Sequence, residues 1–327
     1  MDTLLFRTQI HKPEALTSIN HQHNIMMLGS CFAENIAKKM KAKKFNILLN
    51  PYGVIFNPAS IAQGINFLLS KNKFTTEDLT HTPDEYLSFY HHSYFSAPNK
   101  EECLHKINSR FLQAKDFLKT TDYIIITLGS SIAYRLKSTN NIVANCHKYP
   151  ANSFEKIHLS ANESQELLSN SIATLKKTNP HIQIIFTLSP VRYIKNDFTE
   201  NSLSKANLRI AIQQIQHQFS NAYYFPAFEI MIDDLRDYRY YNQDLIHPSP
   251  LAIDYIWKYF KQSYFDKNTL TLNAKINEIN QAFQHRLKQP HSEKTKLFKK
   301  NILHKIITLN EAHPHLDFQN EKSYFSD

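Results

Sequence analysis

Short apolar runs recur along the first two thirds of the chain, each bounded by polar or turn-forming residues. Four of them, 24–28, 45–50, 123–129 and 182–190, have the length and composition typical of buried strands in a parallel sheet. A fifth run, 222–227, is weaker. Turns and helical spacing alternate with these runs. The pattern therefore predicts an α/β protein with a doubly wound, flavodoxin-like sheet.

Helical spacing is clearest after the first and the fourth runs. After the first run, three apolar residues stand four apart: Phe32, Ile36 and Met40. After the fourth run, four apolar residues continue one stripe: Leu203, Leu208, Ile212 and Ile215. The last core helix is predicted to begin after Ser249, which can cap it, with Pro250 in its first turn. Its predicted buried stripe has four members: Ile253, Ile256, Trp257 and Phe260.

Two segments fall outside this alternation. Residues 71–121 are rich in His, Tyr and Phe, and they are predicted to form an inserted helical cap or long loop within a domain spanning 1–264. Residues 265–327 are polar and basic, with amphipathic helices expected at 273–288 and 292–312. We expect this extension to pack on the core. Self-association and contact with an anionic surface are the alternatives.

The composition is that of a soluble globular protein. Hydrophobic residues make up 42% of the chain and charged residues 20%, and no apolar run reaches the length of a membrane span. The first residues contain an early acid and no long apolar stretch, so no signal peptide is expected. Three cysteines without metal-site spacing (Cys31, Cys103 and Cys146) suggest free thiols in a reducing cytoplasm.

The net charge of +9, from 38 basic and 29 acidic residues, has two interpretations. It can mark an anionic substrate or surface, or simply a solvated basic surface. We favour the second and expect no nucleic-acid partner, because no basic-aromatic binding motif is present. Histidine is plentiful, but no recognised metal-ligand spacing, phosphate loop or dinucleotide glycine pattern occurs, so we expect no metal and no cofactor. The oligomeric state is left open.

Glycine is scarce, which draws attention to the places where it remains. The chain has 4 glycines, where average usage would give roughly 23. Gly29 ends the first apolar run directly before Ser30 and Cys31. A side chain on that turn would lie at the carboxyl edge of the sheet and at a helix N-terminus, where the dipole favours a thiolate. Cys31 is thus a candidate nucleophile and Ser30 its rival, the alternative for Cys31 being a small buried core residue.

A second candidate group precedes the last core helix. Asp244 and His247 are three residues apart in a turn, so the carboxylate can hold one imidazole nitrogen and leave the other as a general base. A capped surface turn is the alternative. Gly53 and Gly129 end the second and third predicted strands, where their N–H groups could approach an oxyanion. Gly64 falls in a helical pattern and is expected only to pack.

Several long motifs occur in an order that resembles the GSCFA-domain proteins, a family similar to the SGNH or GDSL-like hydrolases. They are "LGSCFAEN", "NPYGVIFNPASI", "ANCHK", "SPVRYIK" and "YRYYNQDLIHPS", and together they span roughly residues 5–262. The resemblance implies a three-layer, flavodoxin-like α/β fold. It also implies acyl-ester hydrolysis or acyl transfer through a nucleophile, a histidine and an aspartate.

Carried over position by position, the resemblance places Cys31 where the nucleophilic serine of the hydrolases stands. The hydrolases share several short sequence blocks, which are numbered along the chain. Gly53 matches the glycine of their second block, whose N–H serves the oxyanion hole, and Gly129 matches the glycine of their third block. The asparagine expected two residues after Gly129 is Ser131 here, so Asn57 or Asn145 would have to replace it. Asp244 and His247 match the last block. A thiol nucleophile would favour acyl transfer or thioester chemistry over simple ester hydrolysis.

Two further residues are candidates for the same site. His147, in the "ANCHK" motif, could approach the pocket from a loop after the third strand. Arg192 follows the fourth strand and could bind an anionic substrate group, or could instead pair with the acidic residues Asp233, Asp234 and Asp237.

The sequence therefore predicts a cytoplasmic acyl-ester hydrolase or acyltransferase acting on a small molecule, with an O-acylated carbohydrate or lipid as a candidate substrate. The alternative is an inactive hydrolase-like fold that binds a ligand or a partner chain. A third possibility, binding to nucleic acid or membrane, rests only on net charge.

Overall fold

Five parallel strands form the central sheet in the computed structural model, which describes residues 8, 10, 17–195, 197–285 and 292–326. Their order across the sheet is β10 (Ala222–Phe225), β9 (Gln183–Leu188), β5 (Tyr123–Leu128), β1 (Asn24–Gly29) and β2 (Asn46–Leu49). All neighbouring pairs are parallel. The five strands expected from the apolar runs, including the weak last one, are thus confirmed, and so is the α/β fold class.

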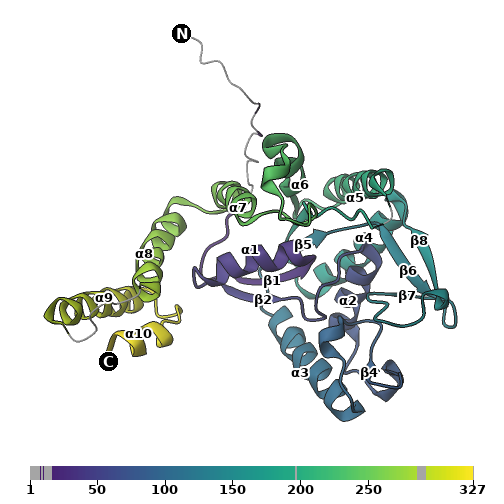
Figure 1. Cartoon of the computed structure of the whole chain (residues 1–327), viewed down its shortest axis with the longest axis horizontal. Helices are drawn as coiled ribbons and strands as arrows, with labels where there is room; N and C mark the ends of the chain where they lie inside the picture. Colours follow the sequence, from purple (N-terminus) through teal and green to yellow (C-terminus); the bar gives the residue numbers. More distant parts are fainter. Residues whose placement is uncertain (1–7, 9, 11–16, 196, 286–291, 327) are drawn as a thin grey trace, which may run out of the picture.

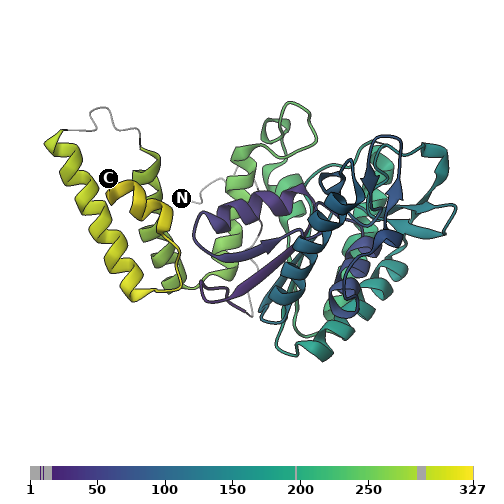
Figure 2. The same ribbon diagram turned by 90° about the horizontal axis from the view of Figure 1, so that it is seen from below.

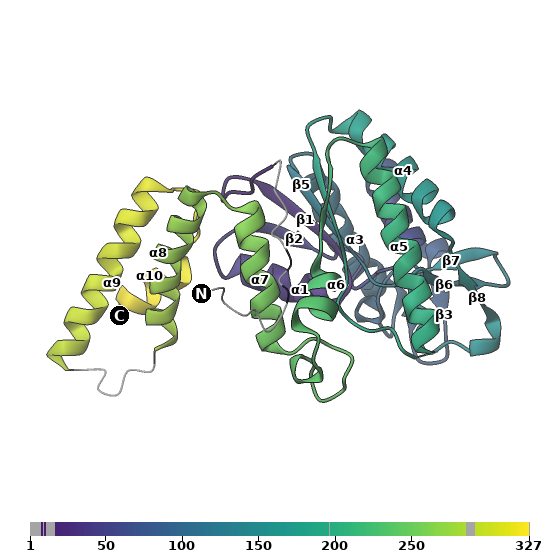
Figure 3. The same ribbon diagram turned by 90° about the horizontal axis from the view of Figure 1, so that it is seen from above.

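Helices cover both faces of this sheet and make three layers (Figures 1 and 3). One face packs on α2 (Pro58–Ser70), α3 (Lys100–Leu118), α4 (Ala161–Thr178) and α5 (Phe198–Gln218). The other face packs on α1 (Cys31–Lys41), α6 (Ala227–Glu229), the π-helical turn η4 (Ile230–Leu235) and α7 (Pro250–Tyr264). Strand residues alternate between the layers as the period of two requires: Met26 faces the first and Met27 the second.

The predicted helical stripes hold for α1 and α7 but not entirely for α5. Ser249 caps α7, and the stripes predicted for α1 and α7 are buried. In α5, Leu208, Ile212 and Ile215 are fully buried, whereas Leu203 is 58% exposed. Ser204 and Lys205 occupy the inner face of the first turns instead, at 3% and 2% exposure. The prediction for Leu203 was therefore wrong, because the packing of α5 turns polar residues toward the sheet edge.

Residues 71–121 divide into two structurally different parts. The first holds short helical turns, η1 (Thr76–Asp78) and η2 (Ser93–Phe95), and a small antiparallel pair, β3 (Thr80–His81) with β4 (Tyr86–Leu87). The second is α3, whose Ile107 and Phe111 are fully buried in the core. This helix belongs to one of the layers that cover the sheet.

A second, antiparallel sheet lies beyond the carboxyl edge of β5, and the apolar pattern did not predict it. Its strands, in the order β7 (Asn141–Val143), β6 (Ile132–Leu136) and β8 (Phe154–His158), are short and half-buried. The 3₁₀ turns η3 (Ala151–Ser153) and η5 (Tyr238–Tyr240) precede β8 and α7 respectively. Because β6 follows β5 directly, this small sheet extends the region where the strands of the central sheet end (Figure 1).

The C-terminal extension folds around a core of its own. It contains α8 (Lys267–Gln284), α9 (Glu293–Ala312) and α10 (Gln319–Ser326), the last of which was not predicted. Buried residues of all three helices meet one another, among them Ile276, Ile306 and Phe325. Figures 2 and 3 show these helices as a bundle beside the central domain. The predicted helix end at 286–288 lies outside the described residues.

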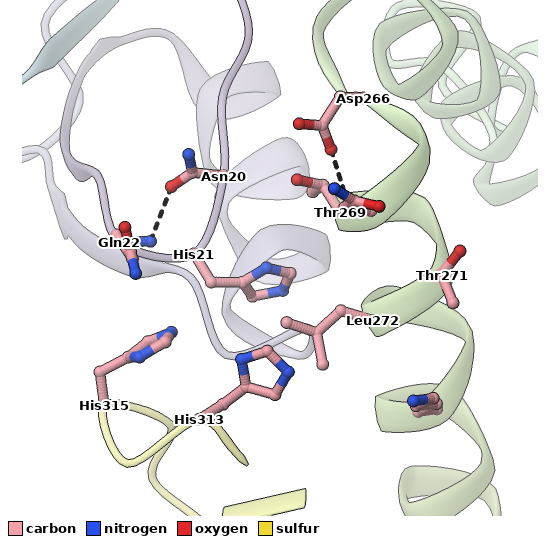
Figure 4. A pocket seen from close by; sticks show the side chains of 11 residues that line it. Asn20, His21, Gln22, Asp266, Thr269, Thr271, Leu272, His313 and His315 are labelled. Atoms are coloured by element: carbon pink, nitrogen blue, oxygen red, sulfur yellow. Dashed lines mark hydrogen bonds between the residues drawn. The ribbon is translucent and has the colours of Figure 1, made fainter.

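Polar contacts join this bundle to the central domain. Lys44 Nζ lies 2.6 Å from Glu321 Oε1 and 5.0 Å from the Phe318 ring centroid. A cavity of about 460 Å³ lies at the junction, and Figure 4 shows His21, His313 and His315 around it. His21 stacks on Phe45 with ring centroids 4.2 Å apart. Among the described residues, no helix has both the length and the apolar character that crossing a bilayer requires.

Candidate active site

The turn between β1 and α1 is held by close contacts on both sides. Gly29 has φ = +145°, and a Cβ at this position would lie 2.4 Å from the carbonyl oxygen of Thr127 in β5. Only glycine fits there. The N–H of Gly29 donates to Asn50 Oδ1 at 2.9 Å, and the N–H of Ser30 donates to the Thr127 carbonyl at 3.2 Å. Residues after β2 and in β5 thus fix the direction in which Ser30 and Cys31 leave the sheet.

Ser30 has a structural role in this turn. It is 5% exposed and caps α1, and its Oγ accepts a hydrogen bond from the N–H of Phe32 at 3.3 Å. The same hydroxyl donates to Oγ of Ser189, 2.9 Å away at the end of β9. Its proton is therefore directed into the protein.

Cys31 is the first residue of α1 and is half-buried at the edge of a cavity. Burial raises the pKa of its thiol, and the nearby Glu34 carboxylate raises it further. The N–H groups of Cys31 and Phe32 and the charge of Lys205 act in the opposite direction on this pKa. Loss of solvation therefore opposes the thiolate that the helix N-terminus was expected to favour. A nucleophilic Cys31 would need a base.

Asp244 and His247 form the hydrogen-bonded pair that the sequence suggested. Asp244 Oδ2 lies 2.7 Å from His247 Nδ1, and Asp244 Oδ1 accepts from the N–H groups of Ile246 and His247 at 2.9 and 3.0 Å. These backbone hydrogen bonds, and then the imidazole, lower the pKa of Asp244 to about 2. Since an ionised carboxylate only accepts, His247 Nδ1 carries the hydrogen. In the neutral ring, Nε2 is then free to take a proton.

Arg192 anchors the loop that carries this pair. Its Nη1 donates to the carbonyl of Leu245 at 3.1 Å, and its N–H donates to the carbonyl of Ile246 at 3.2 Å. The guanidinium also lies over three aromatic rings, those of Phe198, Tyr238 and Tyr241, at 4.9 to 5.5 Å. Leu245 has φ = +56°, an uncommon conformation for a leucine.

Two of the three acidic residues proposed as partners of Arg192 have other contacts. Asp237 pairs with Arg239 at 2.9 Å, and Asp234 accepts from the hydroxyls of Tyr255 and Tyr259. Asp233, the third, lies in η4. Arg192 therefore contributes to the site through the loop that contains His247.

Two adjoining cavities lie where the strands end. We call the first, of about 540 Å³, the nucleophile cavity. Five predicted residues line it: Ser30, Cys31, Gly129, Arg192 and His247. We call the second, of about 510 Å³, the aromatic cavity, because its walls include Tyr134, Tyr149 and Phe154. Four residues line both: Val54, Phe56, Tyr193 and Lys195.

The N–H groups of the two predicted oxyanion glycines already have acceptors. The N–H of Gly53 donates to the carbonyl of Asn50 at 2.9 Å, and the N–H of Gly129 donates to the carbonyl of Phe56 at 2.8 Å. Gly53 has φ = +77°, and a Cβ there would lie 2.3 Å from Cβ of His92. Both glycines therefore serve tight backbone packing in this conformation. The backbone N–H groups of Cys31 and Phe32, at the start of α1, act on the thiol instead and lower its pKa.

The predicted amide and imidazole groups lie in the aromatic cavity. Asn57 caps α2. Its Oδ1 accepts a hydrogen bond from the N–H of Ser60 at 2.8 Å, and its Nδ2 donates to Ser60 Oγ at 2.9 Å. Asn145 Oδ1 accepts from the N–H of His147 at 2.7 Å, and His147 Nε2 lies 3.0 Å from the carbonyl of Ser88. Ser131 donates its N–H to Ser204 Oγ at 2.7 Å. The structure thus separates Asn57, Asn145 and His147 from the residues around Cys31.

Sequence reasoning missed three residues that organise the site. Asn50 orients the first turn, Ser189 binds Ser30, and Lys205 donates to two strand-end carbonyls. Asn50 and Ser189 stand at the ends of the predicted apolar runs 45–50 and 182–190, which was the available signal, because the ends of parallel strands lie at the ligand-binding edge. Lys205 falls in a helical segment and gave no comparable signal.

Within the described ranges, no group of three or more His, Cys, Asp and Glu side chains is arranged to hold a metal ion. The three cysteines are free thiols.

A central parallel sheet covered by helices, with polar turns gathered at its carboxyl edge, defines a three-layer α/β protein. Residues 24–260 match the GSCFA family, and residues 276–327 match the C-terminal domain of GSCFA domain proteins. The chain belongs to the GSCFA family. A search of curated proteins gives no match.

Among solved structures, the chain is similar to two carbohydrate esterases. One is a family 3 carbohydrate esterase of Clostridium thermocellum, with 12% identity, 77% of this chain and 98% of that chain covered, and a TM-score of 0.37. The other, from Talaromyces cellulolyticus, has 8% identity, coverage of 78% and 99%, and a TM-score of 0.35.

Proposed function

We propose that the protein is an acyl-ester hydrolase or acyltransferase in which Cys31 attacks the acyl carbonyl. The observation that carries the proposal is the nucleophile cavity, where Cys31 from the first strand–helix turn and His247 from the last loop line one space. Asp244 holds the other side of the imidazole at 2.7 Å. This is the division of roles that nucleophilic catalysis requires.

The chemistry follows from the state of each group. Because the Cys31 thiol has a raised pKa, it would enter the reaction protonated. His247 Nε2 would take the thiol proton as sulfur bonds to the carbonyl carbon. The same proton would pass to the leaving alcohol as the ester C–O bond breaks, which leaves a thioester on Cys31. Water or an acceptor alcohol, deprotonated by His247, would then release the acyl group and restore the thiol.

Cys31 is the better candidate than Ser30 because of where the two side chains point. The Ser30 hydroxyl is committed to Ser189 and to capping α1. The Cys31 sulfur lies in the first turn of α1, where N–H groups can stabilise negative charge on the attacked carbonyl oxygen.

The two cavities suggest how a substrate with two unlike parts would lie. The walls of the nucleophile cavity are largely apolar and suit the acyl group. The tyrosines, amides and imidazole of the aromatic cavity suit a polar, ring-containing part, such as a sugar. An O-acylated carbohydrate fits this division, while a lipid ester would place its alcohol part in a more polar space than it needs.

The test is ester cleavage by the full chain, compared with the variants Cys31→Ala and His247→Ala. Aryl acetates are suitable first substrates, and mass spectrometry can detect an acyl group on Cys31. Both variants should lose at least about 10²-fold in kcat/KM. His217→Ala, an exposed histidine on α5, serves as the matched control and should remain active. Full activity in His247→Ala would overturn the mechanism.

The second candidate is a binding protein that has lost catalysis. Its support is that the N–H groups of Gly53 and Gly129 already have acceptors and that the Cys31 thiol has a raised pKa. In that case no variant of Cys31 or His247 changes ester turnover above background. Tyr149→Ala in the aromatic cavity would then weaken ligand-induced thermal stabilisation, measured with acetylated sugars.

A further inference from the structure

Lys205 is a buried lysine at the carboxyl edge of the sheet. Its side chain is 2% exposed, and its Nζ donates to the carbonyls of Gly129 and Ser189, each at 2.7 Å. These carbonyls belong to the residues that directly follow β5 and β9. One ammonium group therefore joins two neighbouring strand ends whose residues Gly129 and Ser189 line the nucleophile cavity.

The same strand ends contact the turn that carries Cys31. Ser189 accepts a hydrogen bond from Ser30 Oγ at 2.9 Å, and Gly129, Ser189 and Cys31 line the nucleophile cavity together. Ser204, next to Lys205, binds the N–H of Ser131 and lies 3.1 Å from Ser130 Oγ. The first turns of α5 thus hold both loops that flank the nucleophile.

The charged and titratable groups around Lys205 come from several elements. Cys31 of α1 and Glu229 of α6 both interact favourably with its ammonium. The Glu229 carboxylate is engaged elsewhere, since it accepts from the hydroxyl of Tyr224 and lies 3.8 Å from Arg209. The Phe228 ring lies 5.4 Å away, and His247 lines the cavity above. Burial lowers the pKa of Lys205 to about 7, so its charge can change near neutrality.

We propose that Lys205 is a positioning residue whose buried ammonium fixes the ends of β5 and β9 and stabilises negative charge on Cys31. The inference rests on the proposed function only for the catalytic use of Cys31. A buried positive charge acts strongly because little water screens it. This stabilisation of negative charge on Cys31 is present while Lys205 is protonated and is lost as the pH rises through the lysine pKa. A lysine that only held the two carbonyls would produce no such pH dependence.

The test measures the reactivity of the Cys31 thiol with a methanethiosulfonate reagent from pH 5.5 to 9.5. All proteins carry His247→Ala, so the imidazole above the cavity plays no part. Adding Lys205→Met should slow modification of Cys31 about threefold to tenfold below pH 7. Above pH 9 the two proteins should react at nearly equal rates. Peptide mass spectrometry assigns the modified thiol, and Cys146 serves as an internal reference.

Lys115→Met is the matched control. Lys115 also donates to a backbone carbonyl, that of Lys71 at 2.6 Å, but it lies on α3 and does not line the nucleophile cavity. Its variant should keep the parent profile. An unchanged Cys31 profile in Lys205→Met, or a rate ratio that is the same at every pH, would overturn the proposal.

A second measurement covers the case in which Lys205→Met does not fold. In the His247→Ala protein, the logarithm of the rate should rise with pH at unit slope and become shallower from about pH 7, where Lys205 loses its proton. A straight line of unit slope up to the thiol pKa would contradict the proposal. Because no ester is cleaved in either experiment, the results are independent of whether the chain is an esterase.

Discussion

The guanidinium of Arg192 donates to the carbonyl oxygen of Leu245, 3.1 Å away, and so binds the loop between Asp244 and His247 to the connection after β9. Three aromatic rings around the guanidinium restrict it further. The loop that carries His247 is therefore held in part by a residue 55 positions earlier in the chain. This contact gives Arg192 a role that does not require it to touch a substrate.

Replacing Arg192 should misplace the imidazole while leaving the fold intact. We expect Arg192→Ala to lower kcat/KM for ester cleavage by about 10- to 100-fold, since a shift of ~1 Å in a catalytic group can have such an effect. Arg192→Lys should restore little, because an ammonium cannot both stack on the rings and donate in the same geometry. Arg239→Ala, which removes an exposed arginine nearby, should stay close to wild type. Activity that survives in Arg192→Ala would contradict this role.

Removing the Ser30 hydroxyl should affect stability more than chemistry. Ser30→Ala loses the cap of α1 and the hydrogen bond to Ser189, so the free energy of unfolding should fall by about 1–2 kcal/mol in urea denaturation. The variant should still form a thioester on Cys31, whereas Cys31→Ala should not. An acyl group found on Ser30 in the wild-type protein would reverse the assignment of the nucleophile.

Asp244 should remain ionised throughout the range in which the protein works. Its folded-state pKa of about 2 lies below the usual value, so its favourable contribution is complete above about pH 4 and is lost as the pH falls through about 2. Asp244→Asn should therefore lower kcat/KM by a similar factor from pH 6 to 9, by ~10²-fold. The factor should stay below that of a fully buried triad aspartate, because water screens this pair. A loss of kcat/KM confined to one end of this pH range would refute the assignment of Asp244 as the ionised partner of His247.

His21 at the junction with the C-terminal helices should make stability depend on pH. Burial lowers its pKa to about 4, with His315 and His313 contributing, while an unfolded histidine titrates near 6.5. The unfolded state therefore binds the proton first, and stability should fall by up to about 3 kcal/mol as the pH drops from ~6.5 to ~4. Urea denaturation of His21→Phe, which keeps the stack on Phe45, should show a weaker dependence. His181→Gln, which changes an exposed histidine, is the control and should keep the pH dependence of the wild-type protein.

The sequence predicted features that depend on local pattern and missed those that depend on how helices and loops dock. Apolar runs identified all five strands of the central sheet. The inner strands β1, β5 and β9 are buried on both faces and so are apolar almost throughout, whereas the edge strand β10, with two half-buried residues, gave the weakest run. The phase of α5 was misjudged at Leu203, since tertiary packing turned Ser204 and Lys205 inward. The short strands β6 to β8 are half-buried and carry no clear period.

The candidate site shows the same division. Turn residues such as Cys31 and His247 could be placed at one sheet edge, since parallel strands all end there. The hydrogen-bond partners could not be placed in this way. The N–H of Gly53 donates to Asn50 and the N–H of Gly129 to Phe56, contacts that depend on the exact course of two loops. The same holds for Asn57 and Asn145, which line the aromatic cavity and not the nucleophile cavity.

The connection that follows β9 touches both halves of the candidate site, through Ser189 at the Ser30 turn and Arg192 at the Leu245 loop. It has no strand or helix of its own between residues 189 and 195. Mild denaturant should loosen it before the sheet melts. Under the proposed function, the loss of ester cleavage would then precede the loss of far-ultraviolet circular dichroism, and it would be reversed on dilution of the denaturant as long as the strands stay paired.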